Sequence, residues 1–386
     1  NNGISNNYFL YIIFYLLQKN YLQKKRGMIS FYKRNIINTF LKNIFIVSLV
    51  FFCLVIILNI LEEVTFFKNI DVNFILPIFL TLLNSTSVLF EIFPFIFLIG
   101  TMSFFMELLD KNELIVYKTY GLSNLKIISI IGSTTFLLGI LLITVFYSIS
   151  SNFKFKYLDI KNDYTKDDKY LAVVTSNGLW IKDQIDENIN IISAEKIEEE
   201  NLINVLISQF TTDFDFIRLI EVKEINIRNK NWLISDAFIT QDNITSKNEN
   251  TFTLRTNFNY ERISTLFSNL SSLSILKLNK LKIDYLSLGY STKIISSHLL
   301  KIYLFPLYLS IMICIASILM LNIRHNKARI FYLVTGIVIS VLIYYMNYLF
   351  NILIENQKIP FIFTVWFPQF LLLLFCSVGL VRINEK

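Results

Sequence analysis

An acidic segment between two long apolar runs holds the side chains best suited to a specific contact. From Leu108 to Tyr120, apolar and charged residues recur at the spacing of one short amphipathic helix, and Gly121 follows as its expected C-terminal stop. Such a helix can transmit a push from a soluble motor protein, or it can lie on a lipid surface. Its apolar surface would come from Leu109, Leu114, Ile115 and Tyr117, and its acid from Glu107, Asp110 and Glu113.

An enzyme would need a nucleophile with its base, an acid/base pair, a metal cluster or a phosphate-binding loop, and the sequence indicates none of these. The two histidines are His298 and His325, and the three cysteines, Cys53, Cys314 and Cys376, all lie within apolar runs. No GxxxxGK[ST] run occurs, so any nucleotide energy must come from a partner. We therefore expect neither catalysis nor a cofactor.

The chain is too apolar for a soluble globular protein, because 54% of its 386 residues are hydrophobic. Six apolar runs each have about the length of a tilted membrane helix, three before residue 151 and three after residue 298. They are Ile44–Leu61, Val88–Met106, Ile127–Ile149, Leu299–Leu321, Ile330–Phe350 and Phe361–Val381.

The charges predict which ends of these runs face the cytoplasm. Basic residues crowd one set of flanks, and by the positive-inside rule that face is cytoplasmic. Most of the positive charge is therefore a topology signal, and we expect no nucleic-acid partner. The opposite flanks carry Lys68 and Lys358. The crowded flanks carry Lys33, Arg34, Lys42, Lys111, Lys118, Lys126, Arg324, Lys327, Arg329, Arg382 and Lys386.

Residues 151–298 are polar and show the short alternating segments that are typical of strands. Asn177-Gly178 predicts a two-residue hairpin, and Arg228 to Asn231 a second turn. Three consecutive acids, Glu198 to Glu200, fit an exposed turn better than a cation site. The predicted strands are Tyr170–Thr175, Leu179–Lys182, Ile189–Ser193, Ile217–Ile227, Trp232–Ile239 and Phe252–Thr256.

The expected fold class is an α-helical membrane protein with six transmembrane helices in a 3+3 arrangement and an inserted all-β, jelly-roll-like extracytoplasmic domain. Residues 1–27 are interpreted as an N-terminal extension, non-native or disordered, because Met28 opens a normal lead-in to the first span; an interfacial helix is the alternative there. A helix from Leu278 to Ser291, broken near Gly289, is expected before the fourth span. The predicted division is 28–150 for the first three spans with a cytoplasmic helix at 107–121, 151–297 for the β domain, and 298–386 for the last three spans.

Several short motifs follow one another in a specific order along the chain. Phe93-Pro94 and Leu98–Gly100 precede NELIVYKTYGLS (Asn112–Ser123), which is similar to a SEL-x-x-x-x-A-x-G-x-S signature. Asn177–Asp183 (NGLWIKD) is similar to a G-L-W-x-[KR]-D hairpin, and further matches are Leu273–Lys293, Lys301 with Pro306, and the closing WFPQFLLLLFCSVGLV. In this order the motifs resemble the lipopolysaccharide-export permeases LptF and LptG, and the hairpin is more typical of LptG.

The resemblance implies an ABC-type permease of the bacterial inner membrane with a periplasmic domain. The implied partners are an LptF-like permease subunit in a heterodimer, an LptB-like ATPase dimer, an LptC/LptA-like periplasmic bridge of β-jellyrolls, and lipopolysaccharide. Glu113 then corresponds to the acid of a coupling helix that pairs with an arginine of the ATPase. The remaining residues of that predicted site are Leu109, Asp110, Leu114, Tyr117 and Gly121.

A path for lipopolysaccharide should combine apolar walls with a few cations for its phosphates. Family members carry lysines at the outer end of the first span, but here the stretch NILEEVTFFKNID offers only Lys68, with Asn59 or a neighbour in place of a lysine and Glu62 and Glu63 as added acid. Glu91, expected one turn inside the outer end of the second span, and Pro94, a candidate kink, complete the membrane part of the path.

In the β insert, alternate inward residues would contact acyl chains or simply form a core. The candidates are Phe210, Phe214, Phe216, Ile225, Ile227, Trp232 and Phe238, of which Phe210, Phe216, Trp232 and Phe238 are assigned to the substrate path. An LptF-type subunit remains an alternative, as does a non-transporting membrane protein whose β domain binds a ligand or a partner. A membrane-embedded enzyme is a third possibility, without an acid or histidine cluster in the spans to support it.

Overall fold

The structure is a computed structural model that describes residues Gly3 to Asn384 with internal gaps, and side chains from Phe31 onward. The gaps are residues 163, 165–178, 186–187, 199, 242–243, 249–250, 261, 264–268, 288–290, 323–328 and 356–359. The predicted strand at Tyr170–Thr175, the hairpin at Asn177-Gly178 and the helix breaker Gly289 lie outside the described residues.

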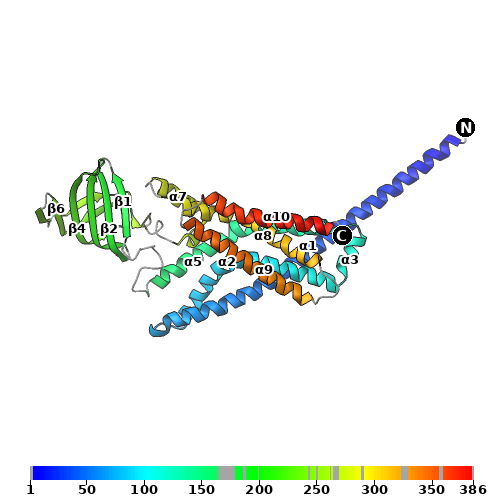
Figure 1. Cartoon of the computed structure of the whole chain (residues 1–386), viewed down its shortest axis with the longest axis horizontal. Coiled ribbons are helices and arrows are strands. Elements are labelled where there is room, and N and C mark those ends of the chain that lie inside the picture. The colour runs from blue at the N-terminus through cyan, green and yellow to red at the C-terminus, as the bar shows by residue number, and fades with distance from the viewer. Residues whose placement is uncertain are drawn as a thin grey trace. The chain divides into compact units, whose positions relative to one another are not determined.

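Among the described residues, six helices are long and apolar enough to cross a membrane, and they confirm all six predicted runs (Figure 1). The third is one continuous helix made of α4, a π-helical turn η2, and α5. The helices are α1 (Gly3–Phe66), α2 (Ile75–Asp110), α4 (Asn124–Leu141) with η2 (Leu142–Phe146) and α5 (Tyr147–Asn162), α8 (Lys293–Leu321), α9 (Arg329–Glu355) and α10 (Phe361–Asn384).

The segment 1–27 is helical from Gly3 and continues into the first span as part of α1. Its interpretation as an extension remains a prediction.

The second span is much longer than the apolar run Val88–Met106 predicted. At 1.5 Å per residue the 36 residues of α2 measure about 54 Å, whereas the hydrocarbon core of a bilayer is about 30 Å thick. Polar residues before Val88 do not end the helix, because their hydroxyls bond to its own carbonyls: Ser85 Oγ donates to Thr81 O (2.6 Å) and Thr86 Oγ1 to Leu83 O (2.9 Å). The helix therefore extends well past the hydrocarbon.

The described elements divide into two compact units, residues 1–57, 91–144 and 302–386, and residues 58–90 and 145–301. The first unit contains only helices and short turns. Within it, α4 and α8 approach closely at Gly139, where a Cβ atom would lie 2.7 Å from the Cα of Pro306. Glycine is required at this crossing for that reason.

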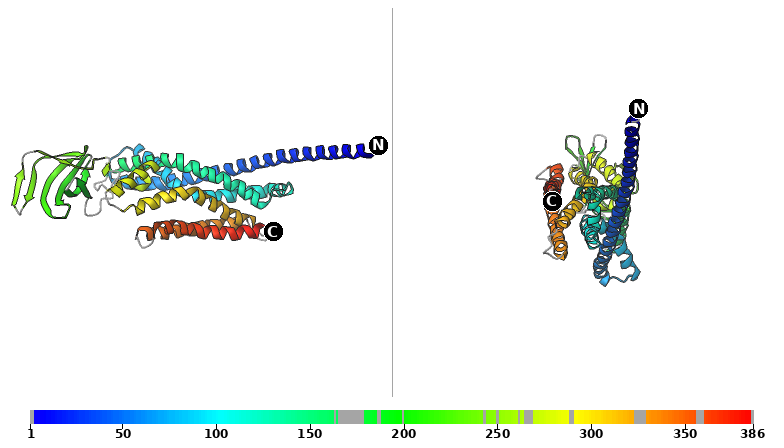
Figure 2. Two further views of the ribbon diagram at one scale, coloured as in Figure 1. Left: turned by 90° about the horizontal axis from the view of Figure 1, so that it is seen from above. Right: turned by 90° about the vertical axis from the view of Figure 1, so that its right-hand side faces the viewer.

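The second unit contains the strands, which form a six-stranded antiparallel sheet in the order β1-β2-β3-β4-β6-β7 and a two-stranded sheet β5-β8 (Figures 1 and 2). The sheets lie between the third and fourth membrane helices in sequence, as predicted. The strands are β1 (Leu179–Ile185), β2 (Asn188–Glu198), β3 (Asn201–Thr211), β4 (Phe216–Asn226), β5 (Asn231–Ile234), β6 (Ala237–Gln241), β7 (Ile244–Asn248) and β8 (Phe252–Arg255).

Strand β3 was not predicted, because Asn204 interrupts its alternation. Leu202 is buried on one side of Asn204, and Val205, Ile207 and Gln209 are buried on the other, so the period of two is broken once. Asn204 has a positive φ of 48°, a conformation that asparagine adopts more readily than most residues. The turn predicted at the acids is confirmed at its described residues, since β2 ends at Glu198 and β3 begins at Asn201.

One predicted strand, Trp232–Ile239, is in fact two strands in two sheets. Strand β5 pairs with β8, whereas β6 pairs with β4 and β7. Asp236 between them has a φ of 54°, and this left-handed residue turns the chain from one sheet to the other. Strand β7, which is short and polar, was also not predicted.

The inner face of the large sheet has an apolar row beside a polar row. Isoleucines at 181, 192, 207 and 220 pair across β1 to β4 and are all buried. In the polar row, Asp183 pairs in register with Asn190 and Gln209 with Arg218. The Nδ2 atom of Asn257 and its backbone N–H both donate to the Asp183 carboxylate (2.9 and 3.1 Å), which joins β1 to the segment after β8.

That segment leads to α7 (Ile275–Ser287), which confirms a helix in this region but begins three residues before the predicted Leu278. Trp232 is fully buried in the β region, and its Nε1 donates to Phe258 O (3.1 Å). Ile225 and Ile227 are buried as well, so these three predicted inward residues form part of the core.

Candidate functional site

The loop between α2 and α4 contains a separate short helix, α3 (Glu113–Thr119), and not the single helix expected from Leu108 to Tyr120. Helix α2 runs on to Asp110, so Leu109 and Asp110 belong to its last turn. Asn112 then adopts a left-handed φ of 56°, which ends one helix and allows the next to start in a new direction. The predicted continuous helix is therefore wrong at its N-terminal part.

Gly121 ends α3 as the sequence indicated. Its φ is +85°, its N–H donates to Lys118 O (2.9 Å), and the N–H of Leu122 donates to Tyr117 O (3.0 Å). These two bonds form a Schellman motif, with Leu122 buried at 3% exposure. The exit of the chain from α3 is thus tightly defined.

Three side chains fix the orientation of α3 against α1. Tyr117 is 1% exposed, its hydroxyl donates to Glu113 Oε2 (2.8 Å), and Asn35 Nδ2 donates to Tyr117 Oη (2.8 Å) and more weakly to Glu113 Oε2 (3.4 Å). Burial, together with the neighbouring Glu113 carboxylate, raises the pKa of Tyr117 to about 12. The phenol is therefore protonated at neutral pH and serves as a donor.

A second polar group holds the end of α2 against α1. Glu107 Oε1 lies 2.7 Å from Lys111 Nζ and 3.2 Å from Lys42 Nζ, and its Oε2 accepts from Asn43 Nδ2 (2.7 Å). Both lysines are more than half exposed, so the stabilisation from these ion pairs is small. Their combined effect is to position the start of α3, which begins six residues after Glu107.

The outer surface of α3 and its C-cap residue carries three apolar side chains beside the exposed Lys118 and Thr119. Ile115 is 62% exposed, Tyr120 45% and Val116 42%, whereas Leu114 and Tyr117 face inward and are buried. The predicted site residues thus divide: Ile115 and Asp110 are exposed, and Leu114 and Tyr117 support the helix from behind. Asn35, which orients the site, was missed because no local pattern connects it to a residue 78 positions later.

Glu91 lies near the middle of the long helix α2, and its place one turn inside the outer end of the apolar run Val88–Met106 stays a prediction. It is 16 residues, about 24 Å, from Ile75, and its side chain is exposed. Helix α2 continues outward from Glu91 through the polar residues before Val88. Pro94 is buried one turn later, where it removes a backbone hydrogen bond from the helix.

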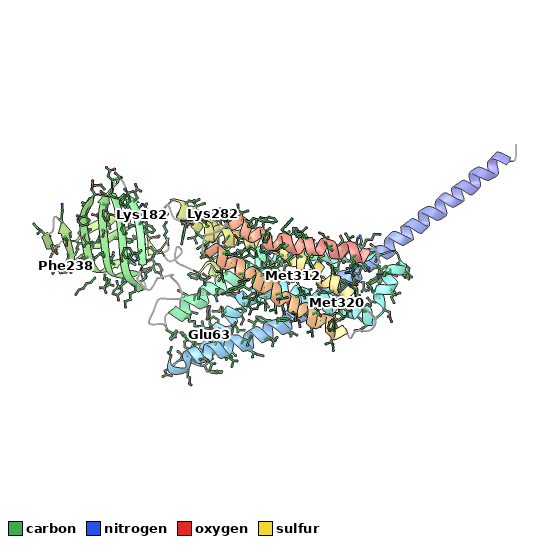
Figure 3. All side chains as sticks on the ribbon, in the orientation of Figure 1. Glu63, Lys182, Phe238, Lys282, Met312 and Met320 are labelled. Atoms are coloured by element: carbon green, nitrogen blue, oxygen red, sulfur yellow. The ribbon has the colours of Figure 1, made fainter. Side chains whose placement is uncertain are left out.

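Of the two acids at the outer end of α1, Glu62 and Glu63, Glu63 is paired with a lysine. Glu63 is fully buried (Figure 3), and its Oε1 accepts from Lys161 Nζ (2.9 Å) and Tyr157 Oη (2.8 Å). Lys161 is 2% exposed and lies over the Phe66 ring at 4.6 Å. The sequence had indicated added acid at Glu63, and the structure corrects this, because the lysine 98 positions later neutralises it.

The neighbouring positions also differ from the family's pattern in a structural way. Asn59, in the place of an expected lysine, is 7% exposed and donates through Nδ2 to Ser85 Oγ (3.1 Å) on α2. It therefore serves helix packing. Lys68 is exposed in the short 3-10 helix Phe67–Asn69 that follows α1, and Glu62 is exposed before it.

The aromatic residues assigned to the substrate path do not share one buried face. Phe210 and Phe216 pair at the end of β3 and β4 where the register shifts, and their ring centroids are 5.8 Å apart. Phe216 is 53% exposed, and Phe214, in the turn between the strands, 59%. Both were expected to be inward, and their exposure shows that the core does not cover this end.

Phe238 was expected on the inner face and is on the outer one. It pairs in register with the exposed Glu221 on β4, and directly opposed residues of an antiparallel pair share a face. The correct inner residue of β6 is Ile239, which pairs with Ile220.

Comparison with known proteins bears on this arrangement directly. The family model described as lipopolysaccharide export system permease LptF/LptG matches residues 34–382, nearly the whole chain. The curated proteins compared with the chain give no match. The matched region contains six apolar helices, the inserted antiparallel sheet and the α3 loop in the order that the motifs predicted. The chain therefore belongs to the LptF/LptG family of lipopolysaccharide export permeases, multi-pass proteins of the inner membrane.

Proposed function

We propose that this chain is a permease subunit of an ABC-type exporter that extracts lipopolysaccharide from the inner membrane, powered by a separate LptB-like ATPase that docks on α3. The observation that carries the proposal is the exposed apolar surface of α3, held in a defined orientation. Ile115, Val116 and Tyr120 face outward, while Tyr117 and Asn35 hold the helix from behind. A soluble ATPase can push on a helix that is fixed in this way.

Glu113 has the geometry for a charged contact with that ATPase. Both of its hydrogen bonds within the described residues use Oε2, and Oε1 accepts none there. The carboxylate is half-buried, so an arginine arriving from a partner would meet an oriented and partly desolvated acid. A pair of this kind sets the register of an interface, and its loss costs about 2 to 5 kcal/mol when it is desolvated.

The remaining residues of the proposed lipopolysaccharide path are assigned by matching their chemistry to the parts of the lipid. Lipopolysaccharide would enter between this subunit and an LptF-like partner and pass Glu91 and the Pro94 break in α2. Its phosphates would meet Lys68, and its acyl chains the exposed aromatic group Phe210, Phe214 and Phe216 at the far end of the sheet. The strand region would then pass the lipid to an LptC/LptA-like bridge in the periplasm.

The β1 segment favours an LptG-type subunit over an LptF-type one. Leu179 to Asp183 form the described part of the G-L-W-x-[KR]-D motif, and Asp183 is buried with two hydrogen bonds from Asn257. Purification together with an LptF-like subunit would support this assignment, and purification with an LptG-like subunit would reverse it.

The proposal is tested by reconstituting the chain with its partner permease and ATPase and measuring ATP-driven lipopolysaccharide release. Glu113→Arg is expected to abolish release while ATP hydrolysis by the ATPase persists. Glu113→Gln is the matched variant, because glutamine keeps an acceptor for Tyr117 and Asn35 and loses only the charge. We expect it to weaken ATPase binding by about 2 kcal/mol or more and to leave the melting temperature unchanged.

Two results would contradict the proposal. One is normal ATP-driven release by Glu113→Gln, which would leave Glu113 with a purely structural role. The other is a failure of the wild-type chain to bind any ATPase in the reconstituted membrane.

A further inference from the structure

Helix α7 has two apolar faces, and within the described part of the chain only one of them packs against the protein. Leu278 and Leu281 are buried at 0% and 1% exposure. Leu276, Ile283 and Leu286 are 83%, 66% and 61% exposed. Positions 276, 283 and 286 recur at helical spacing, so the exposed leucines and isoleucine form one stripe along the helix.

Lysines flank this exposed stripe. At about 100° per residue, Lys280 lies about 40° and Lys277 about 100° to one side of Leu276, and Lys282 about 120° to the other. Lys277 and Lys280 are exposed, and Lys282 is half-buried (Figure 3). Asp284, the acid of α7, is engaged by Arg262 Nη2 (3.2 Å), so the exposed side of the helix is positively charged.

The start of α7 is held at the level where two membrane spans leave the hydrocarbon. The hydroxyl of Tyr147 donates to Leu273 O (3.1 Å) and lies 3.2 Å from Nε2 of His298. The apolar run of the third span ends at Ile149, and that of the fourth begins at Leu299. Helix α7 begins two residues after Leu273, and therefore at the edge of the bilayer.

The far end of α7 is restrained as well. Five residues, 288–292, join Ser287 to Lys293, the first residue of the membrane helix α8, and a chain of that length spans at most about 20 Å. One side of α7 also contacts the continuation of the third helix beyond Ile149, because Lys277 Nζ lies 5.3 Å from the ring centroid of Phe155 on α5. The helix cannot move far from the membrane surface.

We infer that α7 is an interfacial helix that binds the anionic surface of the bilayer. Its exposed stripe, Leu276, Ile283 and Leu286, inserts at the boundary between headgroups and acyl chains, and its flanking lysines bind lipid phosphates. Exposed apolar residues with lysines beside them, on a helix that begins at the bilayer edge, match this surface in both hydropathy and charge.

This contact also anchors the strands. Arg262 donates from Nη1 to Asn257 O (2.9 Å) and from Nη2 to Asp284 on α7, while Asn257 donates to Asp183 on β1. A continuous chain of polar contacts thus runs from the lipid-bound helix to the first strand. The inference holds whichever side of the membrane the strands occupy, and it does not depend on ATP or on lipopolysaccharide.

The inference is tested with nitroxide spin labels on the full chain, assembled with its partner subunits in vesicles containing phosphatidylglycerol. Leu276→Cys and Ile283→Cys are labelled in a background where Cys53, Cys314 and Cys376 are replaced by alanine. We expect both labels to collide readily with oxygen, which dissolves in lipid, and poorly with a water-soluble nickel complex. Ile244→Cys on β7, 72% exposed, is the matched control and should show the opposite pattern.

Two outcomes would overturn the inference. Ready access of the nickel complex to both α7 labels would place the stripe in water, and shielding from both reagents would place it against a protein subunit.

The role of the lysines is tested separately with a triple variant, Lys277→Gln, Lys280→Gln and Lys282→Gln. For the native chain, we expect replacement of phosphatidylglycerol by phosphatidylcholine to raise nickel access at position 283. Each lysine removed should lower the lipid-bound fraction about fivefold relative to the free fraction. A double variant, Lys223→Gln and Lys230→Gln, should behave as the native chain does. Equal insertion into both kinds of vesicle would remove the headgroup part of the inference.

Discussion

Single buried polar side chains connect distant parts of this chain. Asp183 is completely buried on β1, and its carboxylate accepts two hydrogen bonds from Asn257, 74 residues later. A buried acid is stable only when hydrogen-bonded, and here the bonds join the first strand to the segment that leads to α7. The conspicuous position of this aspartate at the end of the G-L-W-x-[KR]-D motif thus has a structural cause.

Asp183→Ala should destabilise the β region by about 2 kcal/mol, because it leaves the half-buried backbone N–H of Asn257 without an acceptor. Asp213→Ala is the control, since Asp213 is exposed in the turn between β3 and β4, and its replacement should change stability by less than about 0.5 kcal/mol. Limited proteolysis of the full chain in detergent would report both. Equal protease resistance of the Asp183→Ala variant and the native chain would contradict this role.

Among the elements, α3 depends for its stability on the Schellman motif that ends it at Gly121. The positive φ of Gly121 allows the two backbone bonds that terminate the helix, and a Cβ atom there would be strained even though nothing lies within 4 Å. The strain would be backbone strain and not a clash with neighbours.

Gly121→Ala should therefore cost about 1 kcal/mol and loosen α3, with weaker ATPase binding as a consequence. Gly132→Ala is a matched control, because Gly132 lies within α4, has open space around it and has no positive φ. There we expect no loss, or a gain of up to about 1 kcal/mol from helix propensity. Thermal unfolding and ATPase co-purification measure the two effects. Identical behaviour of the two variants would show that the helix end is unimportant.

Helices α1 and α5 are joined by a buried ion pair, Glu63 with Lys161. Removing one partner leaves an uncompensated buried charge, so Lys161→Ala should destabilise the protein by about 3 to 5 kcal/mol. The double variant Glu63→Leu with Lys161→Leu should recover most of that loss, and Lys156→Ala, at an exposed position of α5, should be nearly neutral. Melting temperatures of the four proteins test this. A double variant as unstable as the single one would show that the charges themselves are needed.

At the scale of the whole molecule, the function depends on which side of the membrane α3 and the strands each occupy. The crowding of basic residues on the α3 side predicts that α3 is cytoplasmic and the strands periplasmic. The first and third spans, 36 and 38 residues long, are also longer than a bilayer is thick, so each extends beyond the hydrocarbon.

A membrane-impermeant maleimide should therefore label Ile244→Cys on β7 in intact spheroplasts, and Ile115→Cys on α3 only after the membrane is opened. Both side chains are more than 60% exposed, so the difference reports the side of the membrane and not burial. The reverse pattern would place the strands in the cytosol and exclude lipid export by the proposed route.

The sequence by itself determined the six spans, because the thickness of the hydrocarbon imposes a length on any apolar run that crosses it. It also determined the strand character of the insert and the stop at Gly121, which depend on local alternation and on a single backbone dihedral. Only the tertiary structure decided that Glu63 is neutralised by Lys161, that Asn35 orients Glu113, and that Phe238 faces outward opposite Glu221. These depend on strand register and on contacts across 78 to 98 residues, and no local pattern records which distant side chain will fill a buried position.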